Sequence, residues 1–277
     1  MRKWVPCFLL ISLLGCARLG DVRWIEGSFE NALDAAFEQK KQILVDFYSP
    51  ACGPCSRLDQ LVFQNRRTAR FINQTFVPLK IVKDVGEYAR LREFFNMQGF
   101  PTVVVLGPDG VERDRMIGFD GDAETFVATL QEWARNEHTI LSYLRRWAQD
   151  TTEVEWIYRI ADRYTARSQP ELAQKFFQRL LLHDPDDQNG YLAEAKFRLA
   201  LHDLRTTSDP APMLAVLARE TDRRRLNVGY SVLASYYERQ GDHERTLAWY
   251  REALDKLPDA ANLLNAAAWF VYEQQLT

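Results

Sequence analysis

The sequence is poor in cysteine and histidine, with four of each among 277 residues. A small domain held together by a framework of disulfides needs several cysteine pairs, so that class of fold is excluded. The histidines stand far apart from each other and from the cysteines, at His138, His183, His202 and His243. Because a zinc site needs two further ligands beside a cysteine pair, we expect no metal.

Neither sign of charge dominates, and long apolar runs are missing. The formal net charge of -3 offers no general attraction to phosphate backbones, so we expect no nucleic-acid partner. The apolar run at residues 4–14 spans 11 residues, which is well short of the roughly 20 that a membrane-spanning helix requires. No glycine-rich nicotinamide or flavin fingerprint is present, and we therefore expect no cofactor.

The first residues have the order of an export signal. Two basic residues, an apolar run and a small residue follow each other at Arg2, Lys3, residues 4–14 and Gly15. Residues 13–16 (LLGC) resemble the lipobox of bacterial lipoproteins, in which the signal is cleaved before a cysteine that then carries lipid. This resemblance implies a signal over residues 1–16 and lipidation of Cys16. Leu14 is a less usual residue in the motif, so ordinary cleavage, an uncleaved anchor and a buried apolar helix stay open as alternatives.

Export decides which thiols remain. Cleavage before Cys16 removes Cys7, and if Cys16 carries lipid, then Cys52 and Cys55 are the one pair left to form a disulfide. The lipobox resemblance implies the periplasmic face of a bacterial membrane. Ala17 stands where an inner-membrane retention signal would have Asp, which favours the outer membrane.

Residues 24–136 alternate between strand and helix patterns. Strands are predicted at residues 43–48, 76–82, 102–106 and 111–117, the last two forming a hairpin. Helices are predicted after Ser28, after the break at residues 50–53, near Tyr88 and after Asp122. Their apolar residues are Phe29, Ala32, Leu33, Ala36, Phe37, Leu58, Leu61, Val62, Tyr88, Leu91, Phe94, Phe95, Phe126, Leu130 and Trp133. This order of elements predicts an α/β sandwich with a sheet of mixed direction.

From residue 137 to residue 277 only helix patterns continue. An offset of 73 residues pairs Ile160 with Leu233, Ala161 with Ala234, Tyr164 with Tyr237, Phe177 with Tyr250 and Pro185 with Pro258. The spacing within each copy resembles tetratricopeptide helix pairs, which implies a degenerate middle unit at residues 190–222 and a capping helix at residues 261–274. Leu180 and Thr246 stand where that pattern prefers Ala, and a generic helical bundle stays open as the alternative.

The pair Cys52-Gly53-Pro54-Cys55 lies between a predicted strand and the helix that follows it. Both sulfurs then fall on the first helical turn, where backbone N–H groups stabilise the thiolate of Cys52. Cys55 lies one turn further in and is shielded. The spacing therefore predicts a redox-active pair, with a structural disulfide and half of a zinc site as the alternatives.

Three segments resemble motifs of the thioredoxin family in the family's order and spacing: residues 44–48 (LVDFY), 52–55 (CGPC) and 99–102 (GFPT). The resemblance implies a thioredoxin fold, Cys52 as nucleophile, Cys55 as resolving thiol and Pro101 as a cis-proline that faces the active site. It also implies a substrate groove bordered by Ala51, Gly53, Pro54 and Phe100. Ala51 replaces a usual Trp, so the family does not define the substrate range.

Asp46 is a carboxylate within an otherwise apolar strand, where its burial costs free energy that folding alone does not explain. In thioredoxin-like proteins the matching Asp, paired with a Lys on the next strand, relays the proton of the resolving cysteine, and Lys80 occupies the matching place. Burial raises the pKa of Asp46 toward neutrality, and the ammonium of Lys80 limits that rise. The alternative is an exposed Asp on an edge strand.

These residues predict an exported thioredoxin-like oxidoreductase that exchanges disulfides in protein substrates. The Gly-Pro between the cysteines resembles reducing members of the family, and a membrane thiol carrier would then supply the electrons. The helical repeats would bind a peptide or protein partner. A second hypothesis is a repeat-based adaptor in which the thioredoxin-like half is a docking module.

Overall fold

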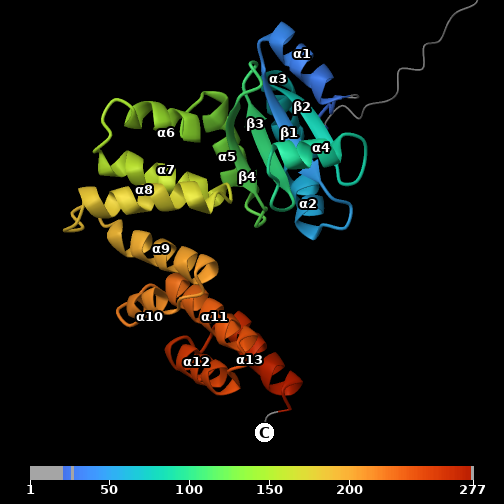
Figure 1. Cartoon of the computed structure of the whole chain (residues 1–277). Helices are drawn as coiled ribbons and strands as arrows, with labels where there is room; N and C mark the ends of the chain where they lie inside the picture. The colour runs from blue at the N-terminus through green and yellow to red at the C-terminus, as the bar shows by residue number, and fades with distance from the viewer. Residues whose placement is uncertain (1–20, 26–27, 276–277) are drawn as a thin grey trace, which may run out of the picture. The chain divides into compact units, whose positions relative to one another are not determined.

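The computed structural model of the chain describes residues 21–25 and 28–275. The predicted signal, Cys7 and Cys16 lie outside the described residues. The chain divides into two compact units, the first reaching Ser142 and the second starting at Tyr143 (Figure 1). Among the residues described, no helix has both the length and the apolar character needed to cross a membrane.

A four-stranded sheet with the strand order β2-β1-β3-β4 is the centre of the first unit (Figure 1). Its strands are β1 (Gln42–Tyr48), β2 (Phe76–Val82), β3 (Thr102–Leu106) and β4 (Glu112–Ile117). β1 pairs parallel with β2 and antiparallel with β3, which pairs antiparallel with β4. This confirms the mixed α/β arrangement, and it places the apolar strand β1 between two neighbours with both faces covered.

Helices cover both faces of this sheet. They are α1 (Phe29–Gln39), α2 (Gly53–Leu58), the π-helical segment η1 (Asp59–Phe63), α3 (Arg66–Thr75), α4 (Tyr88–Phe94) and α5 (Ala123–Ala134). Residues of α1 and α4 pack with Ile43, Val45 and Phe47 of β1. Residues of α2, η1, α3 and α5 pack on the opposite face with Leu44. Because side chains alternate along a strand, Asp46 lies on the same face as Leu44.

Three apolar residues predicted to face the core are exposed instead. The side chains of Phe37, Leu61 and Phe94 are 75%, 46% and 71% exposed. At 100° per residue, Phe37 and Phe94 fall well to the side of the buried stripes on α1 and α4. Leu61 turns outward because α winding changes to wider π winding at Asp59, which brings Val62 and Phe63 to the core.

All described elements after β4 are helices. After α5 they are α6 (Ile140–Trp147), α7 (Val154–Ala166), α8 (Pro170–His183), α9 (Leu192–Thr206), α10 (Ala211–Leu217), α11 (Arg223–Arg239), α12 (His243–Lys256) and α13 (Ala261–Glu273). In the second unit, α7 packs on α8 and α11 packs on α12. The residues paired by the offset of 73 fall at matching places, with Ile160 on α7 and Leu233 on α11 both fully buried. The helical character of this half is confirmed, and the tetratricopeptide assignment stays a prediction.

Candidate functional site

Cys52 and Cys55 form a disulfide at the junction of β1 and α2, with their Cα atoms 5.3 Å apart. Cys52 is the N-cap residue of α2, and the backbone N–H of Cys55 donates to Cys52 Sγ at 3.1 Å. Cys52 is partly exposed, whereas Cys55 is 1% exposed. Cys52 is therefore the more accessible cysteine of the pair, and its place at the start of a helix favours a negative charge on its sulfur.

The surface beside Cys52 is open. Ala51 and Gly53 are exposed and Pro54 is partly exposed. A Cβ on Gly53 would meet no described heavy atom within 4 Å other than those of its chain neighbours and the backbone of its own helix. These residues, which the resemblance assigned to a substrate groove, are thus accessible to another chain.

The loop before β3 lies at the same end of the sheet as the disulfide. The Phe100–Pro101 peptide bond is cis, and the next residue, Thr102, pairs with Phe47 near the end of β1. The hydroxyl of Thr102 donates to the carbonyl oxygen of Gly99 at 2.8 Å and closes the loop. The ring of Phe100 stacks on that of Tyr88 with centroids 6.0 Å apart. Pro101 and Phe100 therefore border the region that follows β1.

Asp46 is 1% exposed and lies on the face of β1 that α2 covers. Lys80 is its neighbour on β2, and Lys80 Nζ is 3.2 Å from Asp46 Oδ2. Neither carboxylate oxygen accepts a well-formed hydrogen bond from any residue that the structure describes. Burial raises the pKa of Asp46 to about 7, the charge of Lys80 opposes the rise, and the charge of Asp59 adds to it. A carboxyl group with this pKa exchanges protons near neutral pH.

Sequence reasoning missed Asp59, the first residue of η1. Lys80 Nζ donates to Asp59 Oδ1 at 2.5 Å, a shorter contact than the one with Asp46. Three aromatic rings surround the same ammonium within 4.7 to 5.6 Å, those of Trp24, Tyr48 and Phe63. Asp59 follows Cys55 by four residues, a spacing that puts two residues on one helix face, and this signal could have found it. No spacing along the sequence indicates Trp24, because it reaches Lys80 through a tertiary contact.

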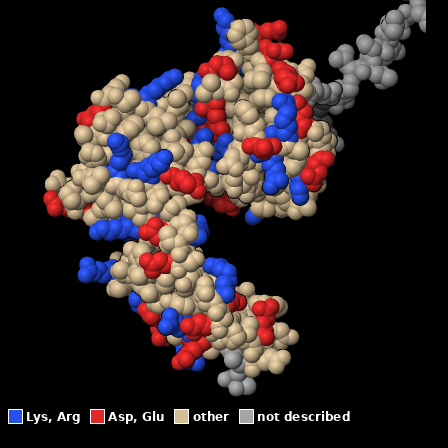
Figure 2. Space-filling view, viewed as in Figure 1, with Lys and Arg blue, Asp and Glu red and all other residues tan. Residues whose placement is uncertain are grey.

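No group of three or more His, Cys, Asp and Glu residues in the described part of the chain is arranged to hold a metal ion. On the face that Figure 2 shows, basic and acidic side chains are interspersed and do not gather into a field of one sign. The arrangement of Cys52, Cys55 and Asp46 is suited to thiol chemistry that needs a nucleophile, a resolving thiol and a proton acceptor.

We expect Asp46→Asn to remove a pH dependence of stability. The pKa of Asp46 is about 7 in the folded protein against an ordinary 3.8, so the folded protein keeps a proton that the unfolded chain releases. Stability therefore falls as pH rises from about 4 to about 7. At about pH 8 the Asn variant should be more stable by about 2 to 4 kcal/mol, and near pH 4 the difference should vanish. Lys80 keeps Asp59 as a partner, so no cation is left unpaired.

Urea unfolding of the oxidised protein at several pH values measures this difference. The opposite face of the sheet offers a control, since Asp34 on α1 is exposed and Asp34→Asn should change neither the stability nor its pH dependence. An Asp46→Asn variant that is less stable than the original protein at about pH 8 would contradict the burial argument.

Comparison with known proteins gives matches to part of the chain. A family model described as Thioredoxin-like matches residues 23–108. A thioredoxin of Mycoplasma genitalium is 34% identical over 87 residues, which cover 31% of this chain and 78% of that protein. The thiol:disulfide interchange protein DsbD of Pseudomonas fluorescens is 28% identical over 108 residues, 38% of this chain and 18% of DsbD. A solved thioredoxin from Thermus thermophilus is 24% identical with a TM-score of 0.36, covering 40% of this chain and 86% of that one.

Proposed function

The chain belongs to the thioredoxin family through its first unit, and on this premise we propose that it is a thiol-disulfide oxidoreductase acting on disulfides of other proteins. The observation that carries the proposal is the disulfide itself, with a partly exposed Cys52 at the start of α2 and a buried Cys55 behind it. An accessible nucleophile in front of a shielded resolving thiol is the arrangement that two-step disulfide exchange requires.

In the reducing direction, the thiolate of Cys52 attacks one sulfur of the substrate disulfide. A mixed disulfide forms, and the other substrate sulfur leaves as a thiolate. Asp46 accepts the proton of Cys55, whose thiolate then attacks the Cys52 sulfur and releases the second substrate thiolate. Two electrons pass to the substrate, and the protein is left with the Cys52–Cys55 disulfide.

A dithiol donor must then return two electrons to Cys52 and Cys55. We propose a membrane thiol carrier for this role, because the chain lacks a nicotinamide or flavin fingerprint and the protein is expected to be exported. The similarity of this chain to a segment of DsbD, a thiol:disulfide interchange protein, supports the choice of such a donor. The Gly-Pro between the cysteines supports the reducing direction by family resemblance.

Insulin reduction tests the activity. With dithiothreitol as donor, the purified full chain should shorten the lag before insulin precipitates. If the chain gives no acceleration over dithiothreitol alone, the second candidate is favoured, in which the helical unit is an adaptor and the thioredoxin-like unit docks. The presence of Cys52, Cys55 and Asp46 together supports the enzyme, since docking alone requires none of them.

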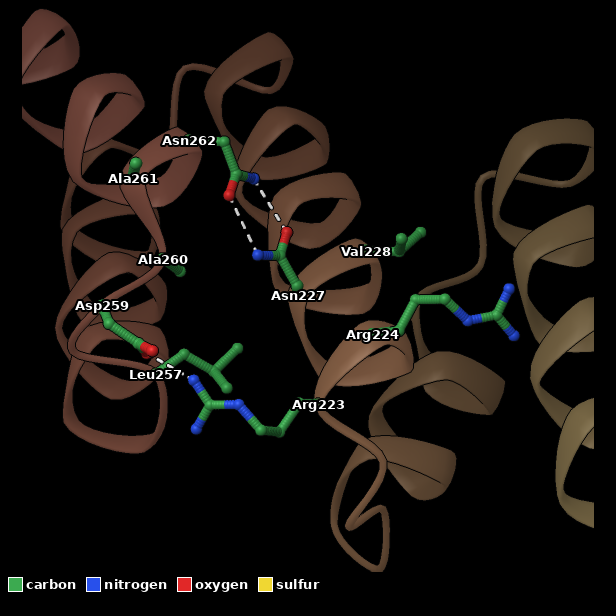
Figure 3. A pocket seen from close by; sticks show the side chains of 9 residues that line it. All are labelled: Arg223, Arg224, Asn227, Val228, Leu257, Asp259, Ala260, Ala261 and Asn262. Carbon is green, nitrogen blue, oxygen red and sulfur yellow. Dashed lines mark hydrogen bonds and ion pairs between the residues drawn. The ribbon is translucent and has the colours of Figure 1, made fainter. Parts of the chain in front are cut away.

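The helical unit is proposed to bind a peptide or protein partner through tetratricopeptide-like repeats. It holds a cavity of about 470 Å³ beside the first turns of α11 and α13 (Figure 3). In this cavity Asn227 and Asn262 exchange amide hydrogen bonds of 2.8 and 2.9 Å, and Arg223 pairs with Asp259. Exposed amide and guanidinium groups can bond to the backbone or carboxylates of a peptide, which supports the proposal.

We further propose that Cys16 is lipidated and anchors the protein at the periplasmic face of a bacterial membrane, with the outer membrane favoured. Cys16→Ser should then move the protein from the membrane fraction to the soluble fraction, while insulin reduction by the purified protein stays unchanged. Fractionation followed by immunoblotting measures the shift, with Cys7→Ser as the matched control. Unchanged membrane association of the Cys16 variant would contradict lipidation.

A further inference from the structure

Lys80 lies between two carboxylates, and its ammonium is closer to one than to the other. Its ammonium donates a hydrogen bond of 2.5 Å to Asp59 Oδ1 and lies 3.2 Å from Asp46 Oδ2. Asp59 is partly exposed and can also be hydrated, whereas Asp46 is buried and accepts no well-formed hydrogen bond from a described residue. The Lys80 ammonium is therefore bound mainly by Asp59, the carboxylate that water can also stabilise.

Three aromatic rings also lie around the Lys80 ammonium. The rings of Trp24 and Tyr48 lie 4.7 Å from Nζ, and the ring of Phe63 lies 5.6 Å from it. Ring faces at these distances attract a cation, and they keep the ammonium within reach of both carboxylates. Tyr48 belongs to β1 and Phe63 to η1, so the elements that carry Asp46 and Asp59 also contribute two of the three rings.

We propose that Asp59 is a positioning residue: by holding the Lys80 ammonium, it keeps that cation from closing a full ion pair with Asp46, and Asp46 stays able to accept the proton of Cys55. The inference rests on the proposed oxidoreductase function and adds a residue to it. Asp59 lies one helical turn beyond Cys55, so α2 carries the resolving thiol and η1, which follows it directly, carries the group that tunes its proton acceptor.

The charged groups that act on Asp46 are few. Lys80 approaches from β2 and Asp59 from η1, and these two change the pKa of Asp46 in opposite directions. β3 and α5 contribute apolar residues to the same face, among them Val103, Val105 and Phe126. The pKa of Asp46 is thus set by its burial together with the balance between one cation and one anion.

Asp59→Asn should upset this balance. Lys80 loses its shortest ionic contact and turns to Asp46, and the repulsion between the two carboxylates disappears. Both changes favour the ionised form, so the pKa of Asp46 should fall by about one unit. The acid limb of the pH profile for resolution of a mixed disulfide should move about one unit lower. The plateau rate should fall about threefold, because Asp46 becomes a weaker base.

The experiment uses the full chain and two readouts. Carbon-13 NMR of the Asp46 carboxyl group in the oxidised protein gives its pKa without any turnover, and stopped-flow mixing of a preformed mixed disulfide gives the pH profile. Asp59→Glu should restore both values, and Asp34→Asn, exposed on the opposite side of the sheet, should change neither. An unchanged or higher pKa in Asp59→Asn would overturn the proposal.

A Lys80→Met background separates positioning from simple repulsion. Without the ammonium, Asp59→Asn should lower the pKa of Asp46 by less than half of its effect in the original chain. An equal shift would mean that Asp59 acts through its own charge alone, and would overturn the positioning role. The NMR titration does not depend on activity, so a chain that fails to reduce insulin but shows these shifts would contradict the proposed function and leave the electrostatic arrangement standing.

Discussion

Replacing Cys52 by serine should lower the rate of insulin reduction by at least about a thousandfold. Without the nucleophile, the covalent pathway through a mixed disulfide is lost altogether. Cys52 is the accessible sulfur of the pair and receives the N–H of Cys55 at 3.1 Å, whereas Cys55 is buried. No other described residue can take over the first attack from that position. The turbidity assay, corrected for dithiothreitol alone, measures the loss.

The chain offers a matched control for this prediction. Cys16→Ser makes the same chemical change at a cysteine outside the described residues, and the purified variant should keep full activity. A Cys52→Ser protein that retains more than about a tenth of the activity would show that another group attacks the substrate, and would contradict the assignment of Cys52 as nucleophile.

The Cys55→Ser variant should accumulate partner proteins joined to Cys52. The first attack is unaffected, but the buried thiol that resolves the mixed disulfide is missing, so the intermediate persists. Expressed in its exported form, the variant should run as new high-mass bands on non-reducing gels. These bands should collapse with reductant and be absent in the Cys52→Ser/Cys55→Ser protein. If the folded Cys55→Ser variant retains no partner protein, the proposed oxidoreductase function would be contradicted.

A shortened trap tests the helical unit. Asp114 is buried and accepts the backbone N–H of Ile140 at 2.8 Å, so a chain ending at residue 136 would leave that carboxylate without this donor. A Cys55→Ser chain ending at residue 149 keeps α6 and this bond. If the repeats select partners, the trapped set should shrink or change. An identical set of trapped proteins would show that the repeats have no role in substrate selection.

Much of the sheet and the redox pair could be predicted locally. β2 and β3 begin and end at the predicted residues. Runs of β-branched and aromatic side chains between turn signals favour a strand from the local sequence alone. α3 was not predicted, since its ten residues contain few apolar positions, and burial of Thr68, Ala69 and Ile72 against η1 and β2 provides its stability. Exposure of Leu61 likewise depends on the π winding of η1, which no apolar pattern records.

Neighbouring residues were enough to predict the thiol pair, its place between a strand and a helix, and the carboxylate in an apolar strand. The family resemblance paired Lys80 with Asp46, but packing alone shows that Asp59 and Trp24 contact the same ammonium. Asp46, Asp59 and Trp24 are far apart along the chain, and they meet Lys80 through strand register, the winding of η1 and the backbone bond from Ile25 N–H to the Pro78 carbonyl oxygen. Electrostatic balance depends on distances of a few ångströms, and such distances exist only after packing.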